Sequence, residues 1–227
     1  LHKEYRRQRQ MCIRDSYMMY DKIKFQDKIT NYLLDGDTSE VDKIENPVST
    51  DPLDTLIDQE NIHGWLDSRI DVVENRLNYA LHHANKAKEK MYDLGVETSK
   101  GKDFSDYNVI FNDLNGYLLD GMPCDRGLSA QVDNDGNLYL ITNNNLHSKY
   151  DKEDIHPEDS LDNTCEGGHD HDHHESFEVS RNDQIKLKDE KSSYHDYRYE
   201  FLKGYFANSP YGVEMVNGIN FRIFPKN

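Results

Sequence analysis

The feature that most constrains the fold is a regular spacing of apolar residues between positions 66 and 94. Successive apolar residues lie four and three positions apart in turn, which places them on one face of an α-helix. The repeat lasts about four heptads, long enough to predict a long helix with a second helix packed along it. Gly95 follows directly and is of the residue type that ends helices, so we expect the helix to stop there. The seam comprises Leu66, Ile70, Val73, Leu77, Ala80, Ala84, Ala87, Met91 and Leu94.

The helix that packs on this seam belongs either to the same chain or to another copy of it. Small side chains at Ala80, Ala84 and Ala87 allow a close approach of the second helix. The same alanines bury little apolar area, which limits the stability of a coiled coil between separate chains. Both arrangements therefore remain open, and we expect a homo-oligomer if the second one holds.

The chain begins with a basic stretch that differs from everything after it. Residues 5–16 read YRRQRQMCIRDS. This string resembles the translated read-through of a sequencing adapter, which implies that residues 1–17 are a non-native extension and that the native chain starts near Met18 or Met19. The alternative is a basic arm that binds an acidic partner.

A helical region is predicted over residues 18–122. Apolar residues every four positions from Phe25 to Leu33 indicate a first helix, which Gly36 ends. Residues 36–50 have no usable period and are predicted to be a linker. A further helix is predicted over 105–119 from its apolar spacing.

The periodicity changes to that of β-strands in the second half. The sequence DNDGN separates two short apolar runs and predicts a hairpin within residues 123–142. Residues 143–175 are polar and acidic and are predicted to be a loop or a disordered segment. Residues 176–227 are predicted to be a β-rich module.

That module has three parts of different character. We expect strands around 177–179 and 185–187 joined by a turn at 180–183, and a second hairpin at Asn217-Gly218. The stretch 194–205 fits either a helix or a bent strand. The fold class is therefore α+β, with N-terminal helices that include the heptad-patterned long helix and with C-terminal antiparallel β-hairpins.

The charge of the chain narrows the choice of partners. A formal net charge of −16 repels nucleic acid and anionic lipid, so we expect neither nucleic acid nor a membrane as partner. A basic protein surface is favoured instead. No run approaches the ~20 apolar residues that span a bilayer. Three widely spaced cysteines indicate no disulfide framework, which points to the cytoplasm or a virion rather than to secretion.

Candidate metal ligands gather in residues 165–175, which read CEGGHDHDHHE. Imidazole and thiolate bind zinc, nickel and iron, and alternate histidines point the same way from an extended backbone. The competing interpretation is a solvated polar loop without fixed geometry, because no apolar residues stand behind the stretch to support a site. The candidate metal ligands are Cys165, His169, His171, His173 and His174.

Two families share part of this histidine pattern. HDHDHH resembles the HxHxDH motif of the metallo-β-lactamase family, but His173 stands at its aspartate position, so that hydrolase activity is not implied. The H-x-H pairs also resemble those of trimeric bacteriophage tail fibres, in which such pairs from three chains surround an iron ion. His169/His171 or His171/His173 would play that part here.

The sequence contains no phosphate-binding glycine loop, serine elbow or zinc-protease helix motif. We therefore expect a non-enzymatic structural or interaction protein that oligomerises through its helices, for which a phage virion or assembly component is a plausible setting. The alternative is a protein, or a metalloenzyme, that binds a divalent transition metal such as Zn, Ni or Fe. We interpret His63, His82 and His83 as surface residues, and His195 as a stacked surface histidine rather than a remote ligand.

Overall fold

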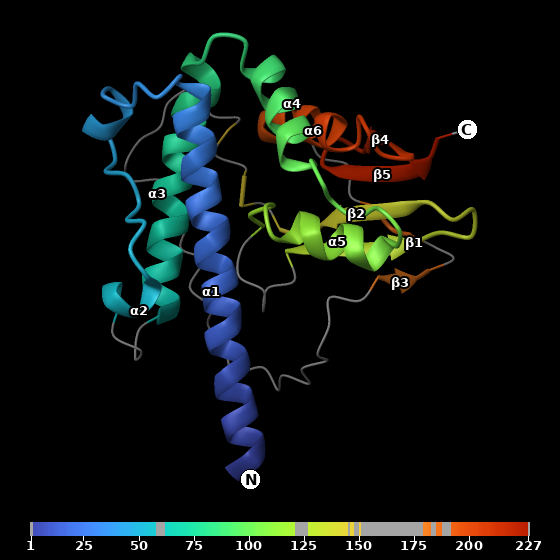
Figure 1. Ribbon diagram of the computed structural model, residues 1–227, viewed down its shortest axis with the longest axis horizontal. Helices are drawn as coiled ribbons and strands as arrows, with labels where there is room; N and C mark the ends of the chain where they lie inside the picture. The colour runs from blue at the N-terminus through green and yellow to red at the C-terminus, as the bar shows by residue number, and fades with distance from the viewer. Residues whose placement is uncertain are drawn as a thin grey trace.

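The computed structural model describes residues 2–57, 62–120, 127–144, 146, 147, 150, 179–182, 185–187 and 192–226, with side chains from residue 14 onward. Helices α1 (His2–Leu33) and α3 (Ile62–His83) pack along one another and form one side of the molecule (Figure 1). Helices α4 (Ala87–Thr98), α5 (Tyr107–Asn115) and α6 (Ser193–Tyr205) accompany the sheet on the other side. The predicted α+β class is confirmed. No helix within the described ranges combines the length and apolar character needed to cross a bilayer.

The heptad seam is divided between two helices of the same chain. α3 ends at His83, and Lys86 takes a left-handed conformation with φ 58° before α4 begins. Apart from the half-buried Ala84, the seam residues are at most 7% exposed. α3 packs on α1, and α4 packs on α6. The seam is therefore covered within the chain, so a contact between copies would have to use other surfaces.

Gly95 lies inside α4, which continues to Thr98, so the prediction that this glycine ends the helix is wrong. A Cβ atom on Gly95 would overlap the carbonyl oxygen of Phe201 in α6. Gly204 of α6 makes the reciprocal approach, because a Cβ atom there would overlap the carbonyl oxygen of Tyr92. The two glycines thus let the backbones of α4 and α6 come into direct contact.

The five-stranded sheet has the order β3-β1-β2-β5-β4. Strands β1 (Leu128–Val132) and β2 (Leu138–Thr142) form the predicted hairpin around DNDGN, with Ala130 opposite Leu140. β4 (Tyr211–Val216) and β5 (Asn220–Pro225) form the second predicted hairpin, and both residues of its Asn217-Gly218 turn have positive φ. β5 joins β2 to close the antiparallel part of the sheet.

The region before α6 differs from its prediction. The two-residue strand β3 (Ser180–Arg181) pairs parallel to β1 within the stretch that was predicted to be a turn. Residues 185–187 are described without a strand, so the strand predicted there is wrong. Residues 194–205, for which the sequence allowed either a helix or a bent strand, belong to helix α6. This helix buries Phe201, Leu202 and Tyr205 against the rest of the core.

The predicted linker, residues 36–50, is held by a buried arginine of α3. It contains a short 3-10 helix, Val41–Lys43, and the four-residue helix α2 (Leu53–Leu56) follows it. Arg76 is 1% exposed and places Nε 2.6 Å from Asp27 Oδ1 of α1. Its Nη1 lies 2.7 Å from Asp42 Oδ1 and 2.6 Å from the Glu45 carbonyl oxygen. One guanidinium therefore fixes this segment to both long helices.

In the part of the chain that the structure describes, two apolar clusters make up the interior. The first apolar cluster joins the C-terminal parts of α1 and α3 to α4, α5, α6 and the sheet. The second apolar cluster joins the middle of α1 to α2 and the N-terminal half of α3. The second comprises Met19, Tyr20, Ile23, Val48, Leu53, Leu66, Ile70, Val72, Val73 and Leu119. Buried polar residues lie where the two clusters meet.

Candidate functional site

The predicted metal ligands, Cys165, His169, His171, His173 and His174, lie outside the described residues. Within the described ranges, no group of three or more His, Cys, Asp or Glu residues is arranged to hold a metal ion. The metal site therefore stays a prediction of the sequence.

The four other histidines interpreted from the sequence fall into two groups. His63, His82 and His83 are exposed on α3, as predicted. The surface position predicted for His195 is wrong, because its side chain is 3% exposed and packs edge-on against Tyr194 and stacks with Phe221. Burial, assisted by the charge of Arg198, lowers the pKa of His195 to about 2, so this imidazole stays neutral.

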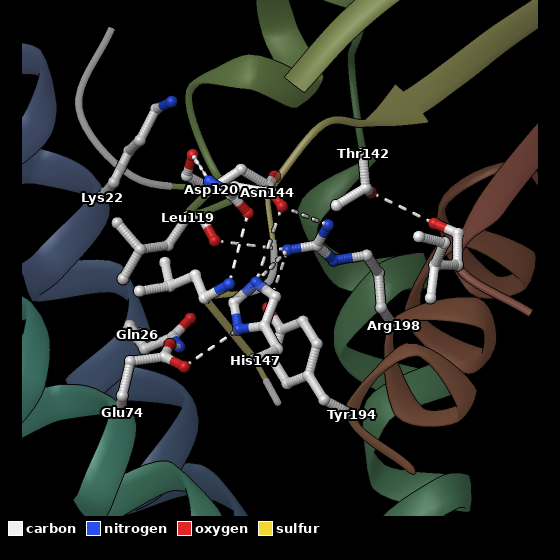
Figure 2. A network of polar contacts seen from close by, with 12 residues as sticks. Lys22, Gln26, Glu74, Leu119, Asp120, Thr142, Asn144, His147, Tyr194 and Arg198 are labelled. Carbon is white, nitrogen blue, oxygen red and sulfur yellow. Dashed lines mark hydrogen bonds and ion pairs between the residues drawn. The ribbon is translucent and has the colours of Figure 1, made fainter. Parts of the chain in front are cut away.

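Among the described residues, the strongest concentration of polar groups is a set of buried side chains that we call the polar layer. Its members come from α1, α3, α5, α6 and the connections after α5 and β2, and each is at most 4% exposed. Figure 2 shows several of them converging on His147 from opposite sides. The polar layer consists of Lys22, Gln26, Glu74, Asn115, Asp120, His147 and Arg198.

The central ion pair of the polar layer joins Asp120 to Arg198. Arg198 Nη1 donates to Asp120 Oδ1 at 2.8 Å, and Nη2 donates to Tyr194 Oη at 2.9 Å. Burial by itself raises the pKa of Asp120, but the charge of Arg198 and the hydrogen bonds of Arg198 and His147 outweigh it, and the pKa lies well below its usual range. Asp120 is therefore a carboxylate throughout the physiological range.

Local backbone structure holds Asp120 in place. Asn144 Nδ2 donates to the Asp120 carbonyl oxygen at 2.8 Å. Gly127 approaches the same carbonyl so closely that a Cβ atom on it would overlap the oxygen. The residues that flank the first hairpin, one at each end, thus fix the backbone of Asp120, whose carboxylate receives Arg198.

His147 lies between two carboxylates and a guanidinium. Its Nδ1 is 2.9 Å from Glu74 Oε2, and its Nε2 is 3.1 Å from Arg198 Nη2 and 3.5 Å from Asp120 Oδ1. The ring also stacks on Tyr194, with 3.6 Å between centroids. Burial by itself lowers the pKa of His147, but the charge of Glu74 and the hydrogen bonds to Asp120 and Glu74 raise it above the ordinary value.

The α1 side of the polar layer contributes a buried ammonium group. Lys22 Nζ donates to Asn115 Oδ1 at 2.8 Å, and Gln26 Nε2 donates to Glu74 Oε1. Burial lowers the pKa of Lys22 to about 8, although the nearby charge of Asp120 acts in the opposite direction. The layer therefore contains a lysine that loses its proton within the range used for biochemical experiments.

The space next to the polar layer is small. A cavity of about 20 Å³ lies between α1, α3, α4 and α6, with Gln26, Tyr194 and Arg198 among its lining residues. This volume holds about one water molecule. Sites for small organic ligands usually measure several hundred Å³. The groups of the polar layer therefore bind one another, and the adjacent cavity has no room for a substrate.

Sequence reasoning missed the polar layer. Its signal is present but faint: Glu74 directly follows the seam residue Val73, and Asp120 directly follows an apolar pair, Leu118-Leu119. A charged residue beside an apolar stripe usually faces solvent, and only partners far along the chain make burial acceptable: His147 for Glu74, and Arg198 for Asp120. Such a partner is not identifiable from spacing.

Comparison with known proteins adds no identification. The chain matches no protein-family model, and no curated protein or solved structure is found to be similar to it. The fold and the polar layer themselves are the basis for assigning a function.

Proposed function

We propose that this protein is a non-enzymatic structural or interaction protein that acts as a homo-oligomer, in a setting such as a phage virion or its assembly. The observation that carries the non-enzymatic part of this proposal is the closure of the polar layer. Asp120, His147 and Arg198 are each at most 3% exposed. Catalytic groups must touch a substrate, whereas these groups contact one another and join helices α3 and α6 to the connections after α5 and β2.

The acidic surface supports a partner of opposite charge. The formal net charge of −16 favours association with a basic protein surface and raises the rate of such an encounter. Because the heptad seam is covered by α1 and α6, contacts between copies would use the outward faces of the helices or the sheet.

The oligomer is tested by sedimentation velocity of the full chain between about 1 and 100 μM at neutral pH. We expect a discrete dimer or trimer whose population increases with concentration. Repeating the run at high salt separates apolar contacts from charge contacts, because screening weakens only the latter. A strict monomer over the whole concentration range would remove the oligomer from the proposal.

A second candidate function is binding of a divalent transition metal, Zn, Ni or Fe, with metal-assisted catalysis as its extension. The observation that favours it is the alternation of His169, His171 and His173 after Cys165. Extended alternation presents the three imidazoles together, and nearby acids increase the local cation concentration.

Metal content of untagged protein, measured by mass spectrometry, tests this candidate. Metal binding predicts near-stoichiometric ion that is lost when His169, His171 and His173 are replaced by alanine. Replacing His63, His82 and His83, which are exposed on α3, is the matched control and should leave the metal content unchanged. A protein without metal, whose melting temperature does not respond to chelation, would contradict the candidate.

A further inference from the structure

The polar layer crosses the molecule between its two apolar clusters. On α3, Glu74 separates Val73 of the second cluster from Leu77 of the first. On α1, Lys22 and Gln26 occupy the corresponding stretch. The two clusters therefore meet partly through charges and hydrogen bonds, whose strength depends on protonation, unlike that of apolar packing.

His147 stands at the point where the chain itself crosses this layer. Leu146 packs against the second apolar cluster, and Tyr150 belongs to the first. Tyr150 Oη donates to the Glu74 carbonyl oxygen at 3.1 Å, and the Tyr150 carbonyl accepts from Ser193 Oγ at 2.8 Å. His147 and its two described neighbours in sequence therefore contact both clusters.

The surroundings of His147 suit two different protonation states. A neutral ring with its proton on Nδ1 donates to Glu74 and accepts from Arg198 Nη2 at the 3.1 Å contact. A charged ring carries a second N–H at Nε2, which opposes the N–H of Arg198 and must turn toward Asp120 Oδ1, 3.5 Å away. The guanidinium thus favours the neutral ring, and the two carboxylates favour the charged one.

We propose that His147 is a proton-operated switch in the joint between the two apolar clusters. The charged ring binds Glu74 and Asp120 together, and the neutral ring exchanges Asp120 for Arg198. This exchange sets how firmly α3, α6 and the residues 146, 147 and 150 are held to one another. Among the described residues, the titratable or charged groups around the ring are Glu74 from α3, Asp120 after α5, Tyr150, and Tyr194, His195 and Arg198 from α6. Lys22 from α1 acts on the partner of the ring, Asp120.

His147 and Lys22 change the stability in opposite directions as the pH rises. Because the pKa of His147 is raised on folding, its contribution is complete below about pH 6.5 and is lost as pH rises through the folded pKa. Lys22 acts in reverse: with a folded pKa of about 8, it releases its proton before the unfolded chain does, so stability increases from about pH 8 upward. The two groups therefore give the stability opposite slopes with pH: His147 lowers it above about pH 6.5, and Lys22 increases it above about pH 8.

Urea denaturation at a series of pH values from 5.5 to 10 tests the switch. For the wild type, we expect the urea concentration at the unfolding midpoint to decrease as the pH is raised above 6.5 and to increase again above pH 8. His147→Gln mimics the neutral ring and should abolish the fall while keeping the recovery. Lys22→Met should keep the fall and abolish the recovery, and His63→Gln, at an exposed position, should behave as the wild type. An unchanged fall in His147→Gln would overturn the proposal.

A measurement on the wild type keeps the proposal testable if a variant does not fold. In ¹⁵N-labelled protein, Nε2 of His147 should change from an acceptor to a donor as pH decreases, with a midpoint above 6.5. The protection of the backbone amides of residues 146 and 147, relative to their intrinsic base-catalysed exchange rates, should be lower on the alkaline side of that midpoint. A ring whose Nε2 keeps one state from pH 5.5 to 9 would also overturn the switch.

Discussion

Replacing Gly204 by alanine is expected to lower the free energy of unfolding by about 3 kcal/mol, the upper part of the range for overpacked cores. The added Cβ would overlap the Tyr92 carbonyl oxygen, which belongs to the backbone of α4 and cannot rotate away. Gly95→Ala should cost a similar amount against the Phe201 carbonyl. Urea denaturation measures both, and the two losses should not add, because one separation of α4 from α6 relieves both overlaps.

Gly101→Ala is the matched control for these variants. A Cβ atom added at Gly101 would meet no other part of the described chain within 4 Å, and the φ of 72° means that alanine there adds only backbone strain. Its expected cost is roughly 1–2 kcal/mol. If Gly204→Ala were no more costly than Gly101→Ala, the close approach of α4 and α6 would be wrong.

Replacing Arg198 by methionine is expected to lower the free energy of unfolding by about 3–5 kcal/mol, because it leaves a buried charge without its partner. Asp120 would lose the 2.8 Å ion pair while remaining 3% exposed. Methionine keeps much of the apolar volume of the arginine, so the loss reports on charge rather than on a cavity. Chemical denaturation at neutral pH provides the measurement.

Arg222→Met supplies the comparison at a half-exposed pair. Arg222 Nη2 lies 2.7 Å from Glu214 Oε1, with the two side chains 35% and 43% exposed. Water screens that pair, so its loss should cost at most about 1 kcal/mol. Equal costs for Arg198→Met and Arg222→Met would contradict the closed state of the polar layer. An Asp120→Leu, Arg198→Met double variant should be less destabilised than the sum of the single changes.

The sequence predicted the hairpins and helices whose formation depends on residues close together in the chain. Both hairpins form where DNDGN and Asn217-Gly218 separate apolar runs, because positive φ in these turns selects Gly and Asn. The apolar spacing of the seam likewise predicted helical structure, but as one helix ended by Gly95, whereas the chain forms two helices, α3 and α4, with a break at residues 84–86. These features depend on neighbours close in sequence and are therefore visible without the fold.

The features that the sequence did not predict depend on partners far along the chain. Glycine commonly ends helices, yet Gly95 lies within α4 and leaves room for the backbone of α6, which comes more than 100 residues later in the sequence. His195 is polar and lies among polar neighbours, yet the fold places it against Phe221 in the interior. The polar layer brings together side chains from six separate stretches of the chain, which no single stretch reveals.

The hold of Arg76 on the stretch after α1 has a practical consequence for dividing the chain. The composition of residues 36–50, a mostly polar stretch between two helices, would suggest dividing the chain there. A fragment that starts at Asp51 would nevertheless strip Arg76 of both its carboxylates, Asp27 and Asp42. α1 and α3 are thus better treated as one inseparable piece in truncation, circular permutation or fusion to a carrier.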